Sequence, residues 1–178
     1  MADQKQLELL KSGVPAFNAW REKNPDVCPD LSGAELTGAD LRGANLSRSA
    51  LAGAFLTVAE LDGSSCVESD LAGANFTGSD ASDADFRQAD MRGADLSYAV
   101  LNHADLRRAD LRAALFTEAI LHDADLRHAR MNGAVLRRSI LLGANLAGAE
   151  LEDADFEDAS LDGATLPIGL GRARRAGG

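Results

Sequence analysis

The amino-acid sequence predicts an all-β solenoid, a four-sided β-helix of about seven coils with an N-terminal α-helical cap. Three observations lead to this prediction: an apolar residue at every fifth position, a small residue two positions before each of them, and surface residues that recur every twenty positions. Fixed periods of this kind are typical of stacked repeat folds. We therefore expect a helical cap at 1–28, a repeat region at 29–168 and a disordered basic tail at 169–178.

The five-residue period runs without a slip from Leu31 to Leu166. Of these 28 large inward positions, twenty are Leu, four are Phe, two are Met, and the others are Cys66 and Ala81. Two residues earlier, 22 of the 28 are Ala and five are Ser. A period of five matches neither the 3.6 of a helix nor the alternation of a strand, so each unit must turn. Within a unit, the small and large side chains face inward and the residue between them faces outward.

The turns and the length of one coil follow from two further patterns. Twelve of the seventeen glycines lie two residues after a large inward position, where we expect a corner of the backbone. Because a solenoid stacks equivalent residues at its coil period, residues that recur every twenty positions indicate four units per coil. These residues include Thr37, Thr57 and Thr77, Asp85, Asp105 and Asp125, and Arg87, Arg107 and Arg127.

The interior of such a tube must be filled at constant volume. Ala81 lies between Phe76 and Phe86 in the repeat, so two enlarged inner positions flank a reduced one. Cys66, twenty residues before Phe86, is expected beneath that ring, and Leu71 completes this part of the predicted core.

A solenoid needs covered ends, and residues 1–28 read as one such cover. The run Asp3–Gln6 resembles a capping box at the start of a first helix. In a second short helix, Phe17 and Trp20 share a face and are expected to cover Leu31 and Leu36. A ligand-binding role for the tryptophan is the alternative.

The repeating unit is A-[D/N]-L-x-x, as in the run Ala39–Gly43, which reads ADLRG. This pattern resembles the pentapeptide repeat family, and the resemblance covers about 140 of 178 residues. It implies a right-handed quadrilateral β-helix. It also implies one function to weigh, because members that protect DNA gyrase from quinolones act as DNA mimics, usually as dimers joined through C-terminal helices.

Catalytic motifs are absent from the sequence, and its glycines are explained by corners. His103 and His122 fall near one corner but lack a third metal ligand. Asp80, Asp83 and Asp85 faintly resemble a calcium loop without its terminal Glu. We therefore expect no enzyme activity, no cofactor and no metal site.

Charge and hydropathy narrow the environment and the partners. The chain carries 28 acidic and 18 basic side chains, a net charge of −10, with an isoelectric point near 4.7. Such a surface repels nucleic-acid phosphates, so direct nucleic-acid binding is not expected. No apolar run is long enough to span a membrane, and Cys28 and Cys66 are expected to be reduced thiols. We expect a cytoplasmic protein.

Two surface features are candidate protein-binding sites. Outward positions that are usually Asp or Asn become apolar on two adjacent faces, which predicts one contiguous strip: Val100, Leu115, Ile120, Val135, Ile140 and Leu142. An exposed patch of this kind favours a protein partner or a homodimer, unless a terminal segment covers it. The final coil is rich in acids: Glu150, Glu152, Asp153, Asp155, Glu157, Asp158 and Asp162. It reads as a solubilising terminus partly neutralised by arginines, or as an acidic docking patch.

Two functions follow. The first is a non-catalytic interaction scaffold that binds a partner, or itself, through its outer faces. The alternative is a DNA mimic that binds and protects DNA gyrase or a related topoisomerase. The repeat region has 24 acids and 11 arginines, a net charge of −13, which suits a mimic. Against this, the aspartates at 85, 105 and 125 are each followed two residues later by an arginine, which weakens the field, and the joining helix is missing.

Overall fold

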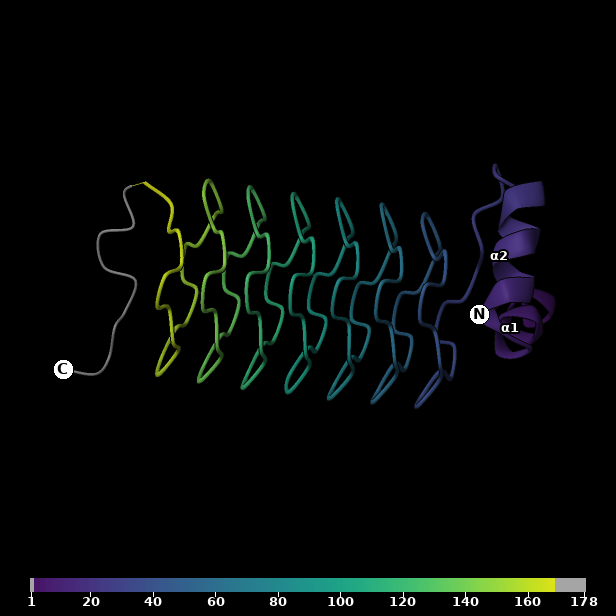
Figure 1. Cartoon of the computed structure of the whole chain (residues 1–178), viewed down its shortest axis with the longest axis horizontal. Coiled ribbons are helices and arrows are strands. Elements are labelled where there is room, and N and C mark those ends of the chain that lie inside the picture. Colours follow the sequence, from purple (N-terminus) through teal and green to yellow (C-terminus); the bar gives the residue numbers. More distant parts are fainter. Residues whose placement is uncertain (1, 169–178) are drawn as a thin grey trace.

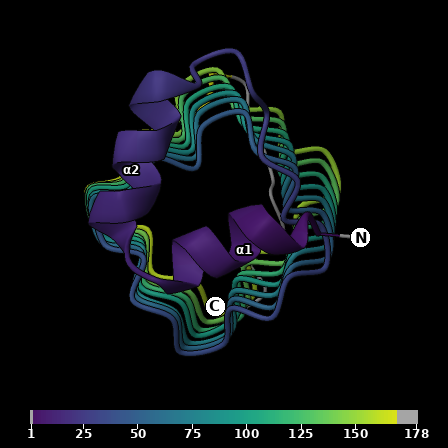
Figure 2. The ribbon, with the colours of Figure 1, turned by 90° about the vertical axis from the view of Figure 1, so that its right-hand side faces the viewer.

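A computed structural model describes residues 2–168 of the chain. Two short helices, α1 (Gln4–Lys11) and α2 (Val14–Lys23), precede a rod of stacked coils that holds the rest of the described residues (Figure 1). The helix pair lies at one end of the rod, with α1 crossing the end of the stacked coils and α2 lying over one side of it (Figure 2). The predicted basic tail at 169–178 lies outside the described residues.

Each coil takes twenty residues, as the recurrence of surface residues predicted. Isolated parallel β-bridges join residues twenty apart, from Asp30 with Ala50 to Asn145 with Thr165. Only one outward residue per side forms each bridge, because the chain turns again within the next few residues. Parallel pairing between coils therefore replaces long strands.

The four sides of the tube are named here by their first outward residue: the Asp30, Glu35, Asp40 and Asn45 faces. The further members of each face follow every twenty residues, so that Asp30, Ala50 and Asp70 stack in one line. Viewed along the rod, the coils superpose as four sides with corners between them (Figure 2).

The interior of the tube is a continuous apolar core. Large inward residues are fully buried from Leu31 to Leu146, and the alanines two positions before them fill the remaining space. Near the other end, Phe156 is 5% exposed and Leu161 and Leu166 are half-buried. Burial thus decreases where no further described coil covers the core.

The corners have a left-handed backbone whether or not they hold glycine. The twelve corner glycines have φ between 61° and 73°, and fifteen residues of other types adopt φ of 50° to 60°, including Val58 and Tyr98. The repeat geometry thus sets the conformation, and glycine is the residue that meets it without steric cost.

The helix pair bonds to the first coil through side-chain amides. Asp3 caps α1 by accepting from the N–H groups of Lys5 and Gln6. The predicted capping box is not closed, because the Gln6 Oε1 accepts instead from the N–H of Asp30 at 2.8 Å. The N–H of Asp3 donates to the C=O of Asp30 at 2.7 Å. The N–H and the C=O of Asp30 are thereby both paired, as they would be by a preceding coil.

The second helix supplies a similar contact on another side. The Asn18 Oδ1 accepts from the N–H of Asn45 at 2.8 Å, and its Nδ2 donates to the C=O of Gly43 at 2.9 Å. Phe17 is fully buried, and the half-buried Trp20 packs against it with ring centroids 5.7 Å apart. Phe17 belongs to the continuous buried core, and Trp20 packs against that core.

Candidate protein-binding surfaces

The predicted apolar strip occupies two adjacent faces. Val100, Ile120 and Ile140 are bridged in line on the Asp40 face, and Leu115 and Val135 are bridged on the Glu35 face. Leu115 is 38% exposed and the other four are half-buried. Half-burial follows from stacking, since each aliphatic side chain is covered by its neighbours in the ladder.

The corner between those faces is polar. Thr117, Glu118, Arg137 and Arg138 lie there, and Arg138 Nη1 is 3.2 Å from Glu118 Oε1. This ion pair separates the two aliphatic ladders along the corner. Leu142, the last predicted member of the strip, is half-buried beyond Ile140.

Sequence reasoning missed the most exposed apolar side chains of the Glu35 face. Phe55 is 43% exposed in the same ladder as Leu115, and Val58 and Tyr98 at its corner are 56% and 55% exposed. The rule that found Leu115, an apolar residue at an outward position, also finds Phe55. The corner residues carried no such signal, because a corner position is normally solvated whatever its residue type.

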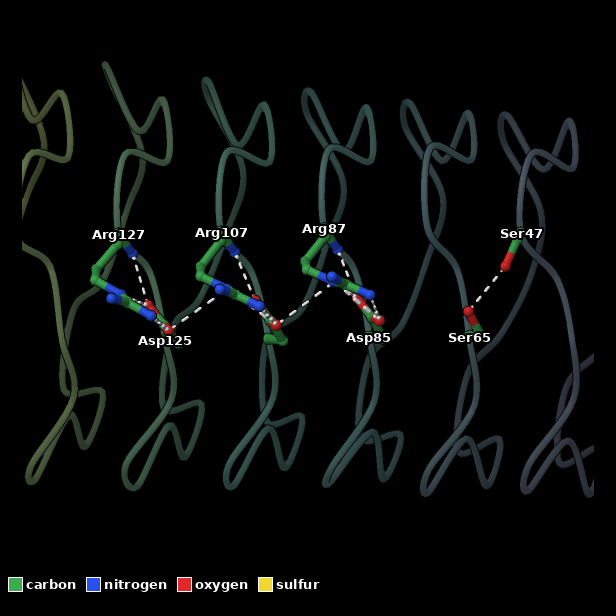
Figure 3. Close-up of polar contacts among 8 residues, drawn as sticks. Ser47, Ser65, Asp85, Arg87, Arg107, Asp125 and Arg127 are labelled. Atoms are coloured by element: carbon green, nitrogen blue, oxygen red, sulfur yellow. Dashed lines mark hydrogen bonds and ion pairs between the residues drawn. The ribbon is translucent and has the colours of Figure 1, made fainter.

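Ion pairs neutralise the Asn45 face. In three successive coils an arginine contacts the aspartate two residues earlier, with Nη2 to Oδ2 distances of 2.6 Å in the pairs Asp85–Arg87, Asp105–Arg107 and Asp125–Arg127. Between coils, Arg87 Nε lies 3.6 Å from Asp105 Oδ2, and the next pair repeats this distance. The result is an alternating ladder of charges along the rod (Figure 3).

These contacts also stabilise the ionised forms of the aspartate and arginine side chains. Hydrogen bonds from Arg92 hold the pKa of Asp90 below its usual value. Burial raises the pKa of Asp85, but hydrogen bonds from Arg87 outweigh it, and the net pKa is lowered. A field from paired charges of opposite sign decays within a short distance of the surface.

The Asp30 face carries a second set of pairs. Arg92 and Arg112 each lie 2.6 Å from the aspartate two residues earlier. Arg130 spans three coils, with Nη1 3.3 Å from Asp110 Oδ2 and Nε 3.6 Å from Glu150 Oε2. Two faces of the rod are therefore largely charge-compensated.

The acidic final coil is compensated only in part. Arg137 lies 2.6 Å from Asp155 and 3.4 Å from Glu157, and Arg130 reaches Glu150. Within residues 2–168, the remaining four predicted patch residues have no ion pair: Glu152, Asp153, Asp158 and Asp162. Acids without an ion pair also occur elsewhere in the described part of the rod, for example Glu68, Asp83 and Asp95, so they are not confined to this end.

The histidines and cysteines form no cluster. His103 and His122 are neighbours through their backbones, since the N–H of His103 donates to the C=O of His122 at 2.8 Å. Among residues 2–168, no three His, Cys, Asp or Glu side chains are placed to share a metal ion. Cys28 is exposed, whereas burial raises the pKa of the Cys66 thiol to about 12.

A cleft of about 620 Å³ lies where the helix pair meets the first coil, outside the filled tube. Its floor is apolar, and Lys11, Asp40 and Arg42 supply its charged side chains. Neither described helix has the length and apolarity needed to cross a lipid bilayer.

Comparison with known proteins places these coils in a family. The family model for pentapeptide repeats matches with eight copies, over residues 30–65, 56–93, 94–133 and 129–166. No curated relative matches the chain.

Solved structures of pentapeptide repeat proteins resemble the chain. Rfr23 from the cyanobacterium Cyanothece 51142 is 32% identical over 55% of this chain, with a TM-score of 0.48. That match spans 63% of Rfr23, so the chain accounts for less than two thirds of that protein. HetL, which is involved in heterocyst differentiation regulation in Nostoc sp. strain PCC 7120, is 33% identical over 81% of this chain and 77% of its own, with a TM-score of 0.40.

A third structure is a trypsin-treated form of QnrB1, a plasmid-mediated fluoroquinolone resistance protein. It is 21% identical over 72% of this chain and 78% of its own, with a TM-score of 0.50, a likeness of fold alone. With matched repeats from residue 30 to residue 166 and bridges every twenty residues along them, the chain belongs to the pentapeptide repeat family and has its quadrilateral β-helix fold.

Proposed function

We propose that the chain is a non-catalytic scaffold that binds a protein partner, or a second copy of itself, through the outer faces of its β-helix. The observation that carries this proposal is the gathering of exposed apolar side chains on one side of the rod. Phe55, Val58, Tyr98 and Leu115 belong to the Glu35 face or its corner, and each is more than a third exposed.

The other two faces of the rod differ from this surface, because they carry paired charges in place of exposed apolar side chains. On the Asp30 and Asn45 faces, arginine and aspartate ladders compensate each other, and such surfaces solubilise a rod without attracting a partner strongly. Interfaces, by contrast, are enriched in aromatic and aliphatic side chains at their centres. The proposed binding surface therefore covers the Glu35 face and the aliphatic ladder of the Asp40 face.

The test compares two doubly substituted chains. Ile120→Asp with Ile140→Asp places two carboxylates in the aliphatic ladder, while Ala50→Asp with Asn145→Asp adds two carboxylates at outward positions of the Asp30 and Asn45 faces. We expect both to keep the circular dichroism spectrum of the parent. Sedimentation velocity and affinity capture with identified partners should lose the complex only with the first pair. If the first variant still forms every complex that the parent forms, the proposed surface is wrong.

The second candidate function is a DNA mimic directed at DNA gyrase. A net charge of −13 over the repeat region and the unpaired acids of the final coil favour it. The compensated ladders on two faces count against it, since a mimic must present a continuous negative field. A gyrase supercoiling assay with and without a fluoroquinolone distinguishes the two functions. Inhibition of supercoiling, or its rescue from the drug, at micromolar protein supports the mimic. If neither effect is seen, only the scaffold function remains.

We propose no catalytic residue, cofactor or metal ion for the chain, and we propose that the protein resides in the cytoplasm. Cell fractionation tests the location, because recovery with membranes or in another compartment contradicts it.

A further inference from the structure

The cleft between the helix pair and the first coil is a second place where this molecule can bind. Its walls come from the end of α1, the turn to α2 and the start of α2, and the first coil along the Asp40 face. A volume of about 620 Å³ is within the range of ligand clefts. Its lining is Leu10, Lys11, Gly13, Val14, Pro15, Leu36, Ala39, Asp40, Leu41 and Arg42.

The backbone at this cleft is an unpaired sheet edge. One coil further on, the N–H of Glu60 donates to the C=O of Ala39 at 3.0 Å, and its C=O accepts from Leu41 at 2.7 Å. The corresponding N–H and C=O of Asp40 have no partner within residues 2–168, and the same holds for Glu35. Gln6 and Asn18 serve only the two other faces. The helix pair thus leaves half of the first coil open to strand addition.

One inner position beside this edge is only partly covered, although Leu36 and Leu41 on either side of it are buried. Ala39 is half-buried, whereas the inward small residues of the next four coils are all buried. The gap above Ala39 is the place that an alanine of a preceding coil would occupy. A segment in that position would complete both the backbone pairing and the packing.

We propose that this cleft binds an extended peptide segment of a partner protein by strand addition, and that it selects the pattern Ala-x-Leu, the pattern of the missing coil. In that register the N–H of Asp40 donates to the peptide alanine C=O, and the peptide leucine N–H donates to the C=O of Asp40. Arg42 is paired with Asp40 and Glu60, so Lys11 provides the uncompensated charge and favours an acidic residue beside the pattern. This site is separate from the Glu35 face, so a failure of one proposed site does not affect the other.

The test uses a fluorescein-labelled peptide, Glu-Ala-Asp-Leu-Ser-Gly, and fluorescence anisotropy with the full chain. A peptide with an N-methylated leucine lacks the donor for Asp40, and a scrambled peptide keeps the charge but loses the pattern. We expect both to bind at least about tenfold more weakly than the parent peptide. Equal binding of the N-methylated peptide, or no binding of the parent peptide at about 1 mM, overturns the proposal.

Two variants locate the site. Ala39→Leu fills the gap, and Lys11→Glu reverses the charge at its rim without touching the core. Lys23→Glu, an exposed change on α2 outside the cleft, is the matched control. We expect the first two to weaken peptide binding about tenfold or more and the control to leave it unchanged.

Amide hydrogen exchange reports on the backbone itself. Bound peptide should slow exchange at Asp40, while Phe55, whose N–H already donates to Ala34, should not change. Binding that spares the Asp40 amide, or that persists in Lys11→Glu and Ala39→Leu, rejects strand addition at this cleft. The chain could instead bind a second copy of itself at this cleft. Dimerisation that Ala39→Leu abolishes and that the peptide does not inhibit would show this, and it would also overturn the proposal.

Discussion

Phe76 and Phe86 meet edge to face across the tube, with ring centroids 6.0 Å apart and ring planes at 87°. Ala81 stands between them in the repeat, on the inner side of the intervening face, and is fully buried. Two enlarged positions and one reduced position therefore share a fixed volume. Packed interiors tolerate such exchanges only when the total volume is kept.

Ala81→Leu is expected to overpack this coil and destabilise the chain by about 1–3 kcal/mol. The reason is that the two phenylalanine rings already fill the volume that the larger leucine side chain would need. Chemical denaturation measures the loss, with Ala72→Leu at a half-buried surface position as the control. Equal stability of the two variants would show that the rings do not fill the space above Ala81.

The side chains of Gln6 and Asn18 are expected to hold the helix pair on the rod. Gln6→Ala leaves the N–H of Asp30 without its 2.8 Å partner, and Asn18→Ala removes the acceptor of the Asn45 N–H and the donor to the Gly43 C=O. We expect each to cost about 1–3 kcal/mol. Gln4→Ala is the control, since Gln4 bonds only within its own segment. Hydrogen exchange should show the loss concentrated in the first coil, and a uniform change along the rod would contradict this.

The two cysteines should differ sharply in reactivity. Cys28 is exposed and Cys66 is fully buried, so a thiol reagent should modify one cysteine per native chain and two after unfolding. Mass spectrometry of the labelled protein counts the modifications and locates them. Rapid native labelling of Cys66 would show that the core opens at that coil.

The same burial makes stability depend on pH. The pKa of the Cys66 thiol rises from 9.0 to about 12 in the folded chain. The folded state therefore holds this proton when the unfolded state has lost it, and stability falls as pH rises above about 9. We expect unfolding curves of the parent to show this loss between about pH 9 and 12. Cys66→Ala, which has no thiol, should show a shallower dependence, and identical slopes would exclude the thiol as the cause.

Much of the fold followed from the sequence because the repeat is local and regular. The twenty-residue spacing of Asp85, Asp105 and Asp125 predicted which residues stack, and they do. Gln6 was predicted only as part of a capping box with Asp3, and its bond to the first coil was missed for the opposite reason. Its partner Asp30 lies 24 residues away, and only the docked helix brings the two together.

The surface was predicted less completely than the core. The apolar ladder of Val100, Ile120 and Ile140 followed from the outward positions. The exposure of Tyr98 depends on the left-handed corner, and the cleft at Ala39 depends on how far α1 and α2 extend over the first coil. Neither is encoded in a five-residue pattern.

A substitution at a corner separates backbone strain from packing. Val58 has φ of 50° and is 56% exposed, so a β-branched residue holds a left-handed conformation with few contacts to offset it. We expect Val58→Gly to stabilise the chain by about 1 kcal/mol, because relief of this strain exceeds the entropic cost of glycine.

The reciprocal change is Gly53→Val, at a corner with φ of 63° where an added Cβ meets nothing within 4 Å. It should destabilise the chain by at least about 1 kcal/mol. The added side chain meets no steric clash with its surroundings, so the loss comes from the left-handed backbone conformation, which valine adopts poorly. Val67→Gly, one residue before a corner, lacks the positive φ and should destabilise the chain slightly. Denaturant midpoints rank the three variants, and a Val58→Gly chain no more stable than Val67→Gly would show that corner conformation carries no strain.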